Sequence, residues 1–389
     1  MKKTICVFTG TRAEYGLLKP LMDRINKDRD WNFQILVSGM HLSAEFGLTY
    51  KEIEKDGFKI SKKVKIITNS DSIAGISKSI GTGIGGYSQA LSRLRPDLII
   101  IFGDRFEALA AAIAALIARI PIVHIGGGEA TYGLIDEAIR HSITKMSLLH
   151  FTSTEEYRQR VVQLGESPCR VFNVGAIGID NILEMKLLTR PELERSLDFS
   201  LGEKSALVTF HPVTLEDNTA KYQVTELLKA LDACPGLKII FTKPNADPGG
   251  RIIIKLIDAY VRRSPNKAAA FSSLGQLRYL SCLKNVNLVI GNSSSGIIEA
   301  PSLKIPTVNI GDRQKGRIRA MSVIDVKPES GQISKAIQKA LSPEFSKFCK
   351  GVSNPYGKGG TVGKIYRLIK KNISSLKDIK KTFYAIGEK

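Results

Sequence analysis

Short apolar runs rich in β-branched residues alternate with segments of helical spacing along almost the whole chain. Continuous apolar runs of this length are typical of strands buried on both faces of a parallel sheet. The first series of predicted strands is Thr4–Thr9, Phe33–Ser38, Leu98–Phe102, Ile122–Ile125, Leu149–Thr152 and Val171–Val174. The helices predicted between them are Leu17–Asn26, Phe106–Ala118, Asp136–Met146 and Glu155–Leu164. This βαβα order predicts a doubly wound α/β fold.

The pattern pauses between Gly175 and Asp198, where Arg190-Pro191 interrupts it, and a second series then begins. Its predicted strands are Ala206–Phe210, Leu237–Thr242, Ala268–Phe271, Val286–Ile290 and Thr307–Ile310. Its predicted helices are Tyr222–Cys234, Arg251–Arg262 and Leu274–Leu283. A chain of 389 residues is long enough for two domains.

We therefore expect two Rossmann-like domains, one over residues 1–178 and one over residues 179–364. A C-terminal helix over residues 365–389 should then cross back to the first domain. The basic pairs Lys370-Lys371 and Lys380-Lys381 are expected on this terminal helix.

Composition excludes several classes of protein. The five cysteines are scattered and form no C-x-x-C pair, which argues against disulfides and structural zinc and favours the cytoplasm. The longest apolar run, Ala108–Ala118, is too short to span a bilayer, so we expect no membrane association. A net charge of +20 raises the question of an anionic partner. We expect no nucleic acid, because no recognition motif is present and aromatics do not interleave with the basic residues.

Ligands of open α/β sheets bind outside the carboxyl ends of the strands, so the residues that follow each strand are candidates for a site. In the first half, Arg12, Asp104 and Glu129 follow three of the predicted strands. In the second half the corresponding polar residues are His211, Lys243-Pro244-Asn245, Asn292–Ser295 and Asp312-Arg313. These positions define the candidate site.

The small-residue loop Gly291–Gly296 leads into a predicted helix and offers backbone N–H groups and hydroxyls to an anion. This chemistry suits a phosphate, although such a turn is also typical of tight packing, and the lysine of a Walker A loop is missing. Glu299, about one turn further on, either accepts hydrogen bonds from a ribose diol or balances the helix dipole. Arg12 either clamps a phosphate or lies on the surface.

Asp104 and Glu129 follow strands of one sheet and could act as acid and base, or else as acids at helix N-termini. His211, before a proline, is either a cleft acid or a loop histidine. The other candidates, His124, His141 and His150, lie within or beside predicted elements and are expected to be structural. No histidine or carboxylate motif predicts a metal site.

Nine motifs along the chain resemble the hydrolysing UDP-N-acetylglucosamine 2-epimerase family, in its bacterial branch for sialic and legionaminic acids. The resemblance covers most of the chain. The motifs are Gly10-Thr-Arg-Ala-Glu-Tyr-Gly16, Ser38-Gly-Met-His-Leu42, Gly103-Asp-Arg105, His124-Ile-Gly-Gly-Gly-Glu129, Ile139-Arg-His-Ser-Ile-Thr-Lys145, Phe210-His-Pro212, Lys243-Pro-Asn245, Gly291-Asn-Ser-Ser-Ser-Gly-Ile-Ile-Glu299 and Asp312-Arg-Gln314.

The resemblance implies two Rossmann-like domains facing across a cleft, the glycosyltransferase-B-like arrangement. It implies that Arg12, Ser293, Ser294 and Arg313 bind the diphosphate of a UDP-sugar. It also implies that Glu299 binds the ribose and that Asn245 lies near the nucleotide. Four residues would line the sugar as catalytic groups: Asp104, Glu129, Asp136 and His211.

Two departures from the family pattern matter. Many relatives have a carboxylate where Gly126 stands and a lysine where Leu17 stands, and Lys19 is out of register with that lysine. The family roles of that carboxylate and that lysine therefore do not transfer to this chain. Glu129 or Asp136 must be considered instead as the base that removes the proton from C2 of the sugar.

The implied chemistry begins at the leaving group, because the proton on C2 of the sugar is not acidic until the C1–O bond to the diphosphate breaks. A carboxylate removes that proton as a glycal forms, and water then adds at C1 while C2 is protonated from the other face. Carboxylates and a histidine suffice, so we expect neither a metal nor another cofactor.

The products would be UDP with N-acetylmannosamine from UDP-N-acetylglucosamine, or UDP with 2,4-diacetamido-2,4,6-trideoxymannose from UDP-N,N′-diacetylbacillosamine. The alternative is a glycosyltransferase of the same two-domain architecture. We expect a homo-oligomer, either a dimer or a tetramer.

Overall fold

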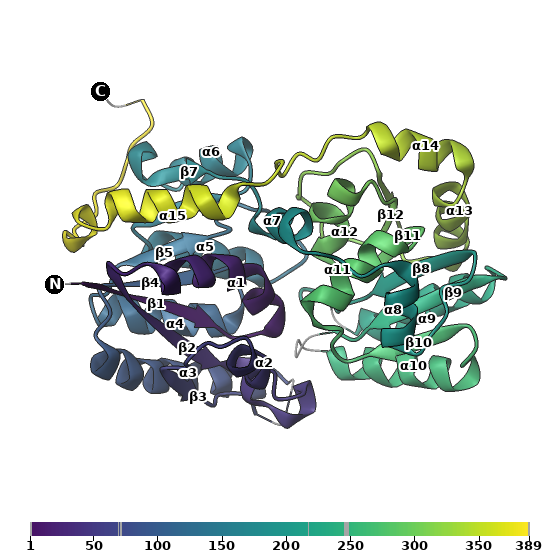
Figure 1. Ribbon diagram of the computed structural model, residues 1–389, viewed down its shortest axis with the longest axis horizontal. Helices are drawn as coiled ribbons and strands as arrows, with labels where there is room; N and C mark the ends of the chain where they lie inside the picture. The colour runs from purple at the N-terminus through teal and green to yellow at the C-terminus, as the bar shows by residue number, and fades with distance from the viewer. Residues whose placement is uncertain (1, 69, 71, 217, 245–248, 388–389) are drawn as a thin grey trace. The chain divides into compact units, whose positions relative to one another are not determined.

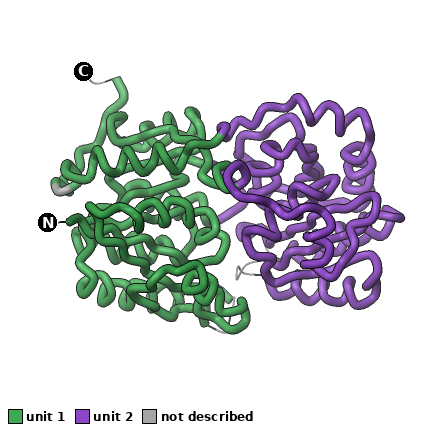
Figure 2. The backbone as a smooth tube through the Cα atoms, in the orientation of Figure 1, with its two compact units in different colours: residues 1–129, 136–181, 359–389 green, residues 130–135, 182–358 purple. Residues whose placement is uncertain are grey.

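The computed structural model describes residues 2–68, 70, 72–216, 218–244 and 249–387. Two compact units divide the chain (Figure 2). Unit 1 comprises Met1–Glu129, Asp136–Asn181 and Gly359–Lys389, and unit 2 comprises Ala130–Ile135 and Ile182–Lys358. The short segment Ala130–Ile135 belongs to unit 2 because its backbone bonds there: Tyr132 N–H donates to Lys315 O at 3.1 Å.

The sheet of unit 1 is parallel throughout, with the strand order β3-β2-β1-β4-β5-β6-β7 (Figure 1). Its strands are β1 (Lys3–Thr9), β2 (Trp31–Ser38), β3 (Lys62–Val64), β4 (Leu98–Phe102), β5 (Ile122–Ile125), β6 (Leu149–Thr152) and β7 (Val171–Asn173). Consecutive side chains of β1 enter different clusters: Ile5 and Val7 lie in one, and Cys6 and Phe8 in the other. The sheet is therefore buried on both faces.

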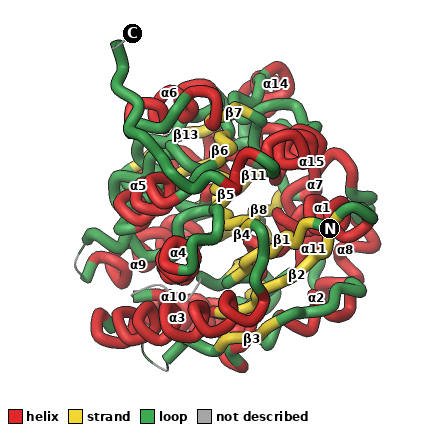
Figure 3. The backbone as a smooth tube through the Cα atoms, turned by 90° about the vertical axis from the view of Figure 1, so that its left-hand side faces the viewer, coloured by secondary structure: helices red, strands yellow, loops and turns green. Residues whose placement is uncertain are grey.

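Helices cover both faces of this sheet, as Figure 3 shows. The helices of unit 1 are α1 (Arg12–Lys27), α2 (Tyr50–Lys55), α3 (Ile73–Leu94), α4 (Phe106–Ile117), α5 (Asp136–Met146), α6 (Glu155–Gln163), α7 (Ile177–Glu184, which ends in unit 2) and α15 (Thr361–Asn372). Helices α1, α2 and α15 pack on the face of Ile5 and Val7, whereas α3 and α4 pack on the opposite face.

Unit 2 has a second parallel sheet, with the order β10-β9-β8-β11-β12-β13. Its strands are β8 (Lys204–Thr209), β9 (Leu237–Thr242), β10 (Ala268–Phe271), β11 (Leu288–Gly291), β12 (Thr307–Ile310) and β13 (Val323–Val326). Its helices are α8 (Arg190–Leu197), α9 (Thr219–Asp232), α10 (Gly250–Arg263), α11 (Gly275–Asn285), α12 (Ser294–Ile298), α13 (Ser330–Ala340) and α14 (Pro343–Gly351). Apolar clusters on the two faces bury this sheet as well.

Every predicted strand is present, and the prediction of two parallel-sheet α/β domains is confirmed. One sequence interpretation is wrong. Arg190-Pro191 does not interrupt the structure but begins α8, since proline is tolerated in the first helical turn and Thr189 forms a capping box with Glu192.

The C-terminal segment also differs from its prediction. Helix α15 ends at Asn372, so Lys370-Lys371 are helical but Lys380-Lys381 are not. Residues beyond the helix are held by side-chain bonds instead: Lys381 Nζ lies 2.7 Å from the buried carboxylate of Glu166. No helix in the described part of the chain is long and apolar enough to cross a membrane.

Candidate active site

The loop between β1 and α1 is fixed by a capping box. Thr11 caps α1 and its hydroxyl accepts the N–H of Glu14, while the Glu14 carboxylate accepts the N–H groups of Gly10 and Thr11 at 2.8 and 3.2 Å. Arg12, the first residue of α1, forms an ion pair with Glu52 of α2 at 2.9 Å. A diphosphate that binds Arg12 would compete with the Glu52 carboxylate for the guanidinium.

A second carboxylate lies beneath this loop and was not identified from the sequence. Glu107 of α4 is fully buried and pairs with Arg105 at 3.2 Å. A Cβ atom added to Gly10 would lie 3.2 Å from Glu107 Cβ, and one added to Gly39 would lie 3.2 Å from Glu107 Oε1. Burial and the charge of Glu107 together raise the pKa of Glu14 to about 7. The floor of the loop is therefore a pair of neighbouring buried acids.

Asp104 and Glu129 converge on one buried arginine. Arg140 of α5 is fully buried, and its Nε donates to the Asp104 carboxylate at 2.7 Å. Its Nη1 donates to the backbone carbonyl of Glu129 at 2.7 Å and to Glu137 Oε2 at 2.6 Å. The Glu129 carboxylate accepts the Ser153 hydroxyl at 3.1 Å. Arg140 thus fixes the two candidate catalytic acids in one network.

Asp136 begins α5 and lies one helical turn before Arg140. The structure therefore brings Asp104, Glu129 and Asp136 together around the start of one helix. The contacts of Arg12 are made elsewhere, with α2. The sequence placed Arg140 within a motif without assigning it a role, although its position four residues after Asp136 puts both on one face of the helix.

The glycine run between β5 and Glu129 is explained by backbone geometry. Gly126 and Gly128 have φ of +93° and +78°, and a Cβ on Gly128 would lie 2.3 Å from the carbonyl oxygen of Tyr157. The carboxylate that many relatives carry at the position of Gly126 would be strained with this backbone. Position 126 therefore does not provide the base in this chain.

His124 plays a structural part beside this run. Its Nε2 donates to the carbonyl of Gly103 at 2.9 Å, and its Nδ1 accepts the Thr144 hydroxyl at 3.2 Å. Burial lowers its pKa to about 4, so the ring is neutral near pH 7.

In unit 2, one buried asparagine organises the candidate residues. The side chain of Asn292 accepts the backbone N–H of His211 at 2.7 Å and donates to the His211 carbonyl at 2.8 Å. The backbone carbonyl of Asn292 accepts Arg313 Nη1 at 3.1 Å and Gln314 Nε2 at 2.9 Å. Asn292 thereby joins the loops after β8, β11 and β12. Its role was missed, although it stands inside the small-residue motif.

The glycines of the loop Gly291–Gly296 allow neighbouring segments to pack closely. A Cβ on Gly291 would lie 2.0 Å from the carbonyl oxygen of Thr209, and one on Gly296 would lie 2.7 Å from Thr307 Cγ2. Ser293 caps α12, and its hydroxyl accepts the N–H of Ser295. Ser294 is the first residue of this five-residue helix, and both serines are half-buried. The hydroxyls of Ser293 and Ser294, rather than the glycines, therefore remain the candidate phosphate ligands.

Glu299 follows α12 and is half-buried. Its backbone N–H donates to Ser295 O at 3.0 Å, and its charge contributes to raising the pKa of buried Tyr279, after the larger effect of burial. Asn245 lies outside the described residues. Over those described residues, no group of three or more His, Cys, Asp or Glu side chains is placed to hold a metal ion.

Residues 23–370 match the family described as UDP-N-acetylglucosamine 2-epimerase. The chain belongs to this family. It is 45% identical over 344 residues to the GDP/UDP-N,N′-diacetylbacillosamine 2-epimerase (hydrolyzing) of Campylobacter jejuni, and the match covers 88% of this chain and 89% of that one. It is 41% identical to a polysialic acid biosynthesis protein of Escherichia coli over 389 residues, which is 100% of this chain and 98% of that one.

A solved member of the epimerase family has the same fold. The UDP-N-acetylglucosamine 2-epimerase of Neisseria meningitidis bound to UDP-N-acetylglucosamine aligns with a TM-score of 0.80 and 21% identity, over 95% of this chain and 100% of that one. The family and the hydrolysing 2-epimerase type of enzyme predicted from the motifs are both confirmed.

Proposed function

We propose that the chain hydrolyses UDP-N,N′-diacetylbacillosamine with inversion at C2, releasing UDP and 2,4-diacetamido-2,4,6-trideoxymannose. The observation that supports this most directly is the 45% identity to the Campylobacter enzyme that is named for this sugar. UDP-N-acetylglucosamine is the second candidate, because the Escherichia coli relative at 41% identity is named for polysialic acid biosynthesis. Both sugars carry the 2-acetamido group and the UDP that the reaction needs.

The first step releases UDP. The C1–O bond breaks, its electron pair goes to the β-phosphate, and donors must meet the charge that develops there. In unit 2, Ser293, Ser294 and Arg313 are the groups proposed to bind the diphosphate, with Glu299 on the ribose. Asn292 is a positioning residue, since its carbonyl holds Arg313 and its side chain holds His211.

The second requirement is proton transfer at C2. We assign it to the carboxylates of Asp104, Glu129 and Asp136, one of which removes the proton as the C1=C2 double bond of the glycal forms. Water then gives its oxygen to C1, and C2 receives a proton on the opposite face. Arg140 is a positioning residue here: its guanidinium donates hydrogen bonds to the Asp104 carboxylate and to the backbone carbonyl of Glu129.

Product analysis in heavy water tests the proposal. Both UDP-sugars are supplied separately, and the products are identified by NMR and mass spectrometry. The expected result is free sugar that is inverted and deuterated at C2, with UDP in equal amount, formed faster from the diacetylbacillosamine donor. Faster turnover of UDP-N-acetylglucosamine would overturn the choice of sugar. Intact donor in the absence of an acceptor, with transfer once an acceptor is added, would establish the glycosyltransferase alternative.

Two further expectations remain predictions. The homo-oligomer is tested by light scattering on the purified chain, and the cytoplasmic location by cell fractionation. Neither outcome changes the assignment of the residues above.

A further inference from the structure

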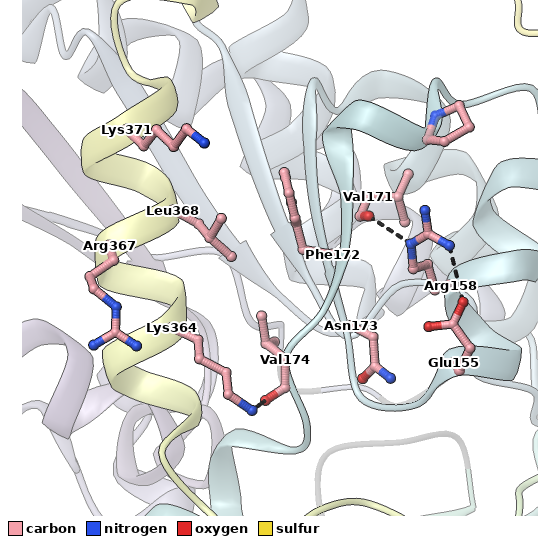
Figure 4. Close-up of a pocket in the computed structure, with 11 residues that line it drawn as sticks. Glu155, Arg158, Val171, Phe172, Asn173, Val174, Lys364, Arg367, Leu368 and Lys371 are labelled. Atoms are coloured by element: carbon pink, nitrogen blue, oxygen red, sulfur yellow. Dashed lines mark hydrogen bonds and ion pairs between the residues drawn. The ribbon is translucent and has the colours of Figure 1, made fainter.

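A groove in unit 1 runs between the edge strand β7 and helix α15, and no step of the proposed reaction uses it (Figure 4). Its volume is about 540 Å³, which is within the range of sites for small molecules. The residues that line it come from α6, the turn before β7, β7 itself and α15. None of them is among the residues assigned to the UDP-sugar.

Three cations of α15 line this groove, and in Figure 4 Lys364 and Lys371 extend from the helix toward β7, whereas Arg367 runs along the helix. Lys364, Arg367 and Lys371 are spaced by three and four residues, so they share one face of the helix, and all three line the groove. Lys364 Nζ lies 3.4 Å from the carbonyl oxygen of Val174. Arg367 and Lys371 form no ion pair with a carboxylate of the described residues. Like charges at this spacing repel one another, so the row favours an anionic ligand.

A neighbouring side of the same helix provides the contrast. Lys370 pairs with Asp28 at 2.9 Å and with Asp30 at 2.8 Å, and Asp28 also accepts the Tyr366 hydroxyl. Lys370 is therefore neutralised by two carboxylates, whereas Arg367 and Lys371 have no carboxylate partner among the described residues.

The wall opposite α15 is of mixed character. Phe172 and Val174 supply apolar surface on this wall, and Leu368 faces them from α15. Asn173 supplies an amide that can donate and accept hydrogen bonds. The only carboxylate among the lining residues, Glu155, is paired with Arg158 at 3.0 Å. An aromatic ring beside a row of cations matches a ligand that has a planar body and several phosphate charges.

We propose that this groove is a second nucleotide-binding site. The phosphates lie along Lys364, Arg367 and Lys371, and the base packs against Phe172. The cations recognise phosphate rather than one base, so the class of ligand is a nucleotide carrying two or three phosphates.

Equilibrium dialysis with radiolabelled ATP tests this site. Saturating UDP is present throughout to occupy the proposed substrate site, and magnesium is omitted so that ATP keeps its full charge. We expect about one ATP to bind per chain. The double variant Arg367→Ala/Lys371→Ala should weaken ATP binding at least about tenfold, because two charge-assisted contacts are lost. Both side chains are exposed, and an unchanged melting temperature verifies folding.

The matched control is Lys347→Ala/Lys350→Ala on α14, which removes two exposed positive charges in unit 2. It should bind ATP like the wild type. Tripolyphosphate, which has the charge without the base, should bind at least about tenfold more weakly than ATP. The absence of ATP binding, or equal weakening in the control, would overturn the site. Equal affinity for tripolyphosphate would overturn the nucleotide and leave a site for polyphosphate alone.

Discussion

The loops after β1 and β11 begin in the same way and are held by different chemistry. Each has a glycine at the end of its strand region and a hydroxyl residue that caps the following helix: Gly10 and Thr11 in unit 1, Gly291 and Ser293 in unit 2. Beneath Gly10 lie two buried carboxylates, Glu14 and Glu107. Behind Gly291 lie the backbone of Thr209 and the neutral amide of Asn292.

The difference assigns distinct properties to the two units. Unit 1 holds its candidate acids and the loop after β1 in networks of ionisable groups, and in that loop burial and Glu107 raise the pKa of Glu14 to about 7. Unit 2 fixes its candidate phosphate ligands through amide hydrogen bonds, whose strength does not change with titration near neutrality. We therefore expect chemistry and pH dependence to follow unit 1, and nucleotide affinity to follow unit 2.

The largest effect, on turnover, is expected from substitution of the candidate catalytic acids of unit 1. Asp104→Asn and Glu129→Gln should each lower kcat by about a hundredfold or more, the range for loss of a general acid or base. UDP affinity should stay within about twofold, since neither Asp104 nor Glu129 is among the residues assigned to the diphosphate. Steady-state kinetics and calorimetry with UDP measure the two quantities. Near wild-type turnover in either variant would remove that residue from the chemistry.

The next effect concerns the stability of unit 1. The pKa of Glu14 is about 7 in the folded chain, against 4.5 for an ordinary glutamate, because burial and Glu107 disfavour its charge. The folded state therefore holds this proton more tightly, and its contribution to the free energy of unfolding is full below pH 4.5. It falls by about 3 kcal/mol as the pH rises to 7.

Glu14→Gln should abolish this fall in the free energy of unfolding as the pH rises. Urea unfolding at several pH values compares it with the wild type, and the exposed Glu54→Gln, whose carboxylate pairs with Lys63, serves as control. Parallel stability curves for the wild type and Glu14→Gln would show that Glu14 does not titrate in this range.

Asn292→Ala should destabilise unit 2 by about 2–3 kcal/mol, because the buried N–H and carbonyl of His211 lose their partners. It should also weaken UDP binding, since the loop that carries His211 loses its side-chain support, while the backbone carbonyl that holds Arg313 remains. The matched control is Asn181→Ala, which removes a buried side-chain hydrogen bond to the carbonyl of Gly16 in unit 1. It should lower stability and leave UDP affinity unchanged. Equal UDP affinity in both variants would show that Asn292 is structural only.

Loss of single phosphate ligands should be milder. Ser294→Ala and Arg313→Ala should each weaken UDP binding by about 1–3 kcal/mol, the value for a charge-assisted hydrogen bond. Titration calorimetry measures this directly. Unchanged affinity in both would place the diphosphate away from this loop.

The smallest effect concerns the residues after α15. Lys381→Met removes one of two lysine partners of Glu166. Burial raises the pKa of Glu166, but hydrogen bonds and charges from His150, Lys145 and Lys381 outweigh it and lower the pKa to about 2. We expect a loss of about 1 kcal/mol near pH 7. This difference should shrink as the pH falls from about 4.5 toward 2, where Glu166 becomes protonated. Thermal melts at pH 7 and at about pH 3 measure the change, and a constant difference would exclude the ionic explanation.

Strand positions followed from the sequence because buried parallel strands are continuous apolar runs, and several boundaries agree to the residue, such as Leu98–Phe102 and Leu237–Thr242. Helix α3 was missed because it contains Gly75, Gly81, Gly83, Gly85 and Gly86, which disfavour an isolated helix. Tertiary packing requires two of these: a Cβ on Gly86 would lie 2.5 Å from Val64, and one on Gly83 would lie 3.1 Å from Ala110.

The candidate residues at strand ends could be named from topology, because parallel strands end at one edge of a sheet. The residues that hold these candidates in place could not be named in this way. Arg140, Glu107 and Asn292 act through contacts between segments that are distant along the chain, and no local pattern encodes such contacts. The basic residues of α15 were counted as general charge, since only the fold separates Lys370, which is paired, from Lys371, which faces the groove.

The return of α15 to unit 1 constrains the order in which the polypeptide can mature during synthesis. The core of unit 1 includes Val362, Ile365 and Ile369, which are translated after all of residues 182–358. At about 5–20 residues per second, that interval lasts on the order of 10–40 s. During this time the apolar face of the first sheet lacks its last helix. Nascent chains should therefore need a chaperone over unit 1 longer than over unit 2, whose larger segment, Ile182–Lys358, is translated without interruption.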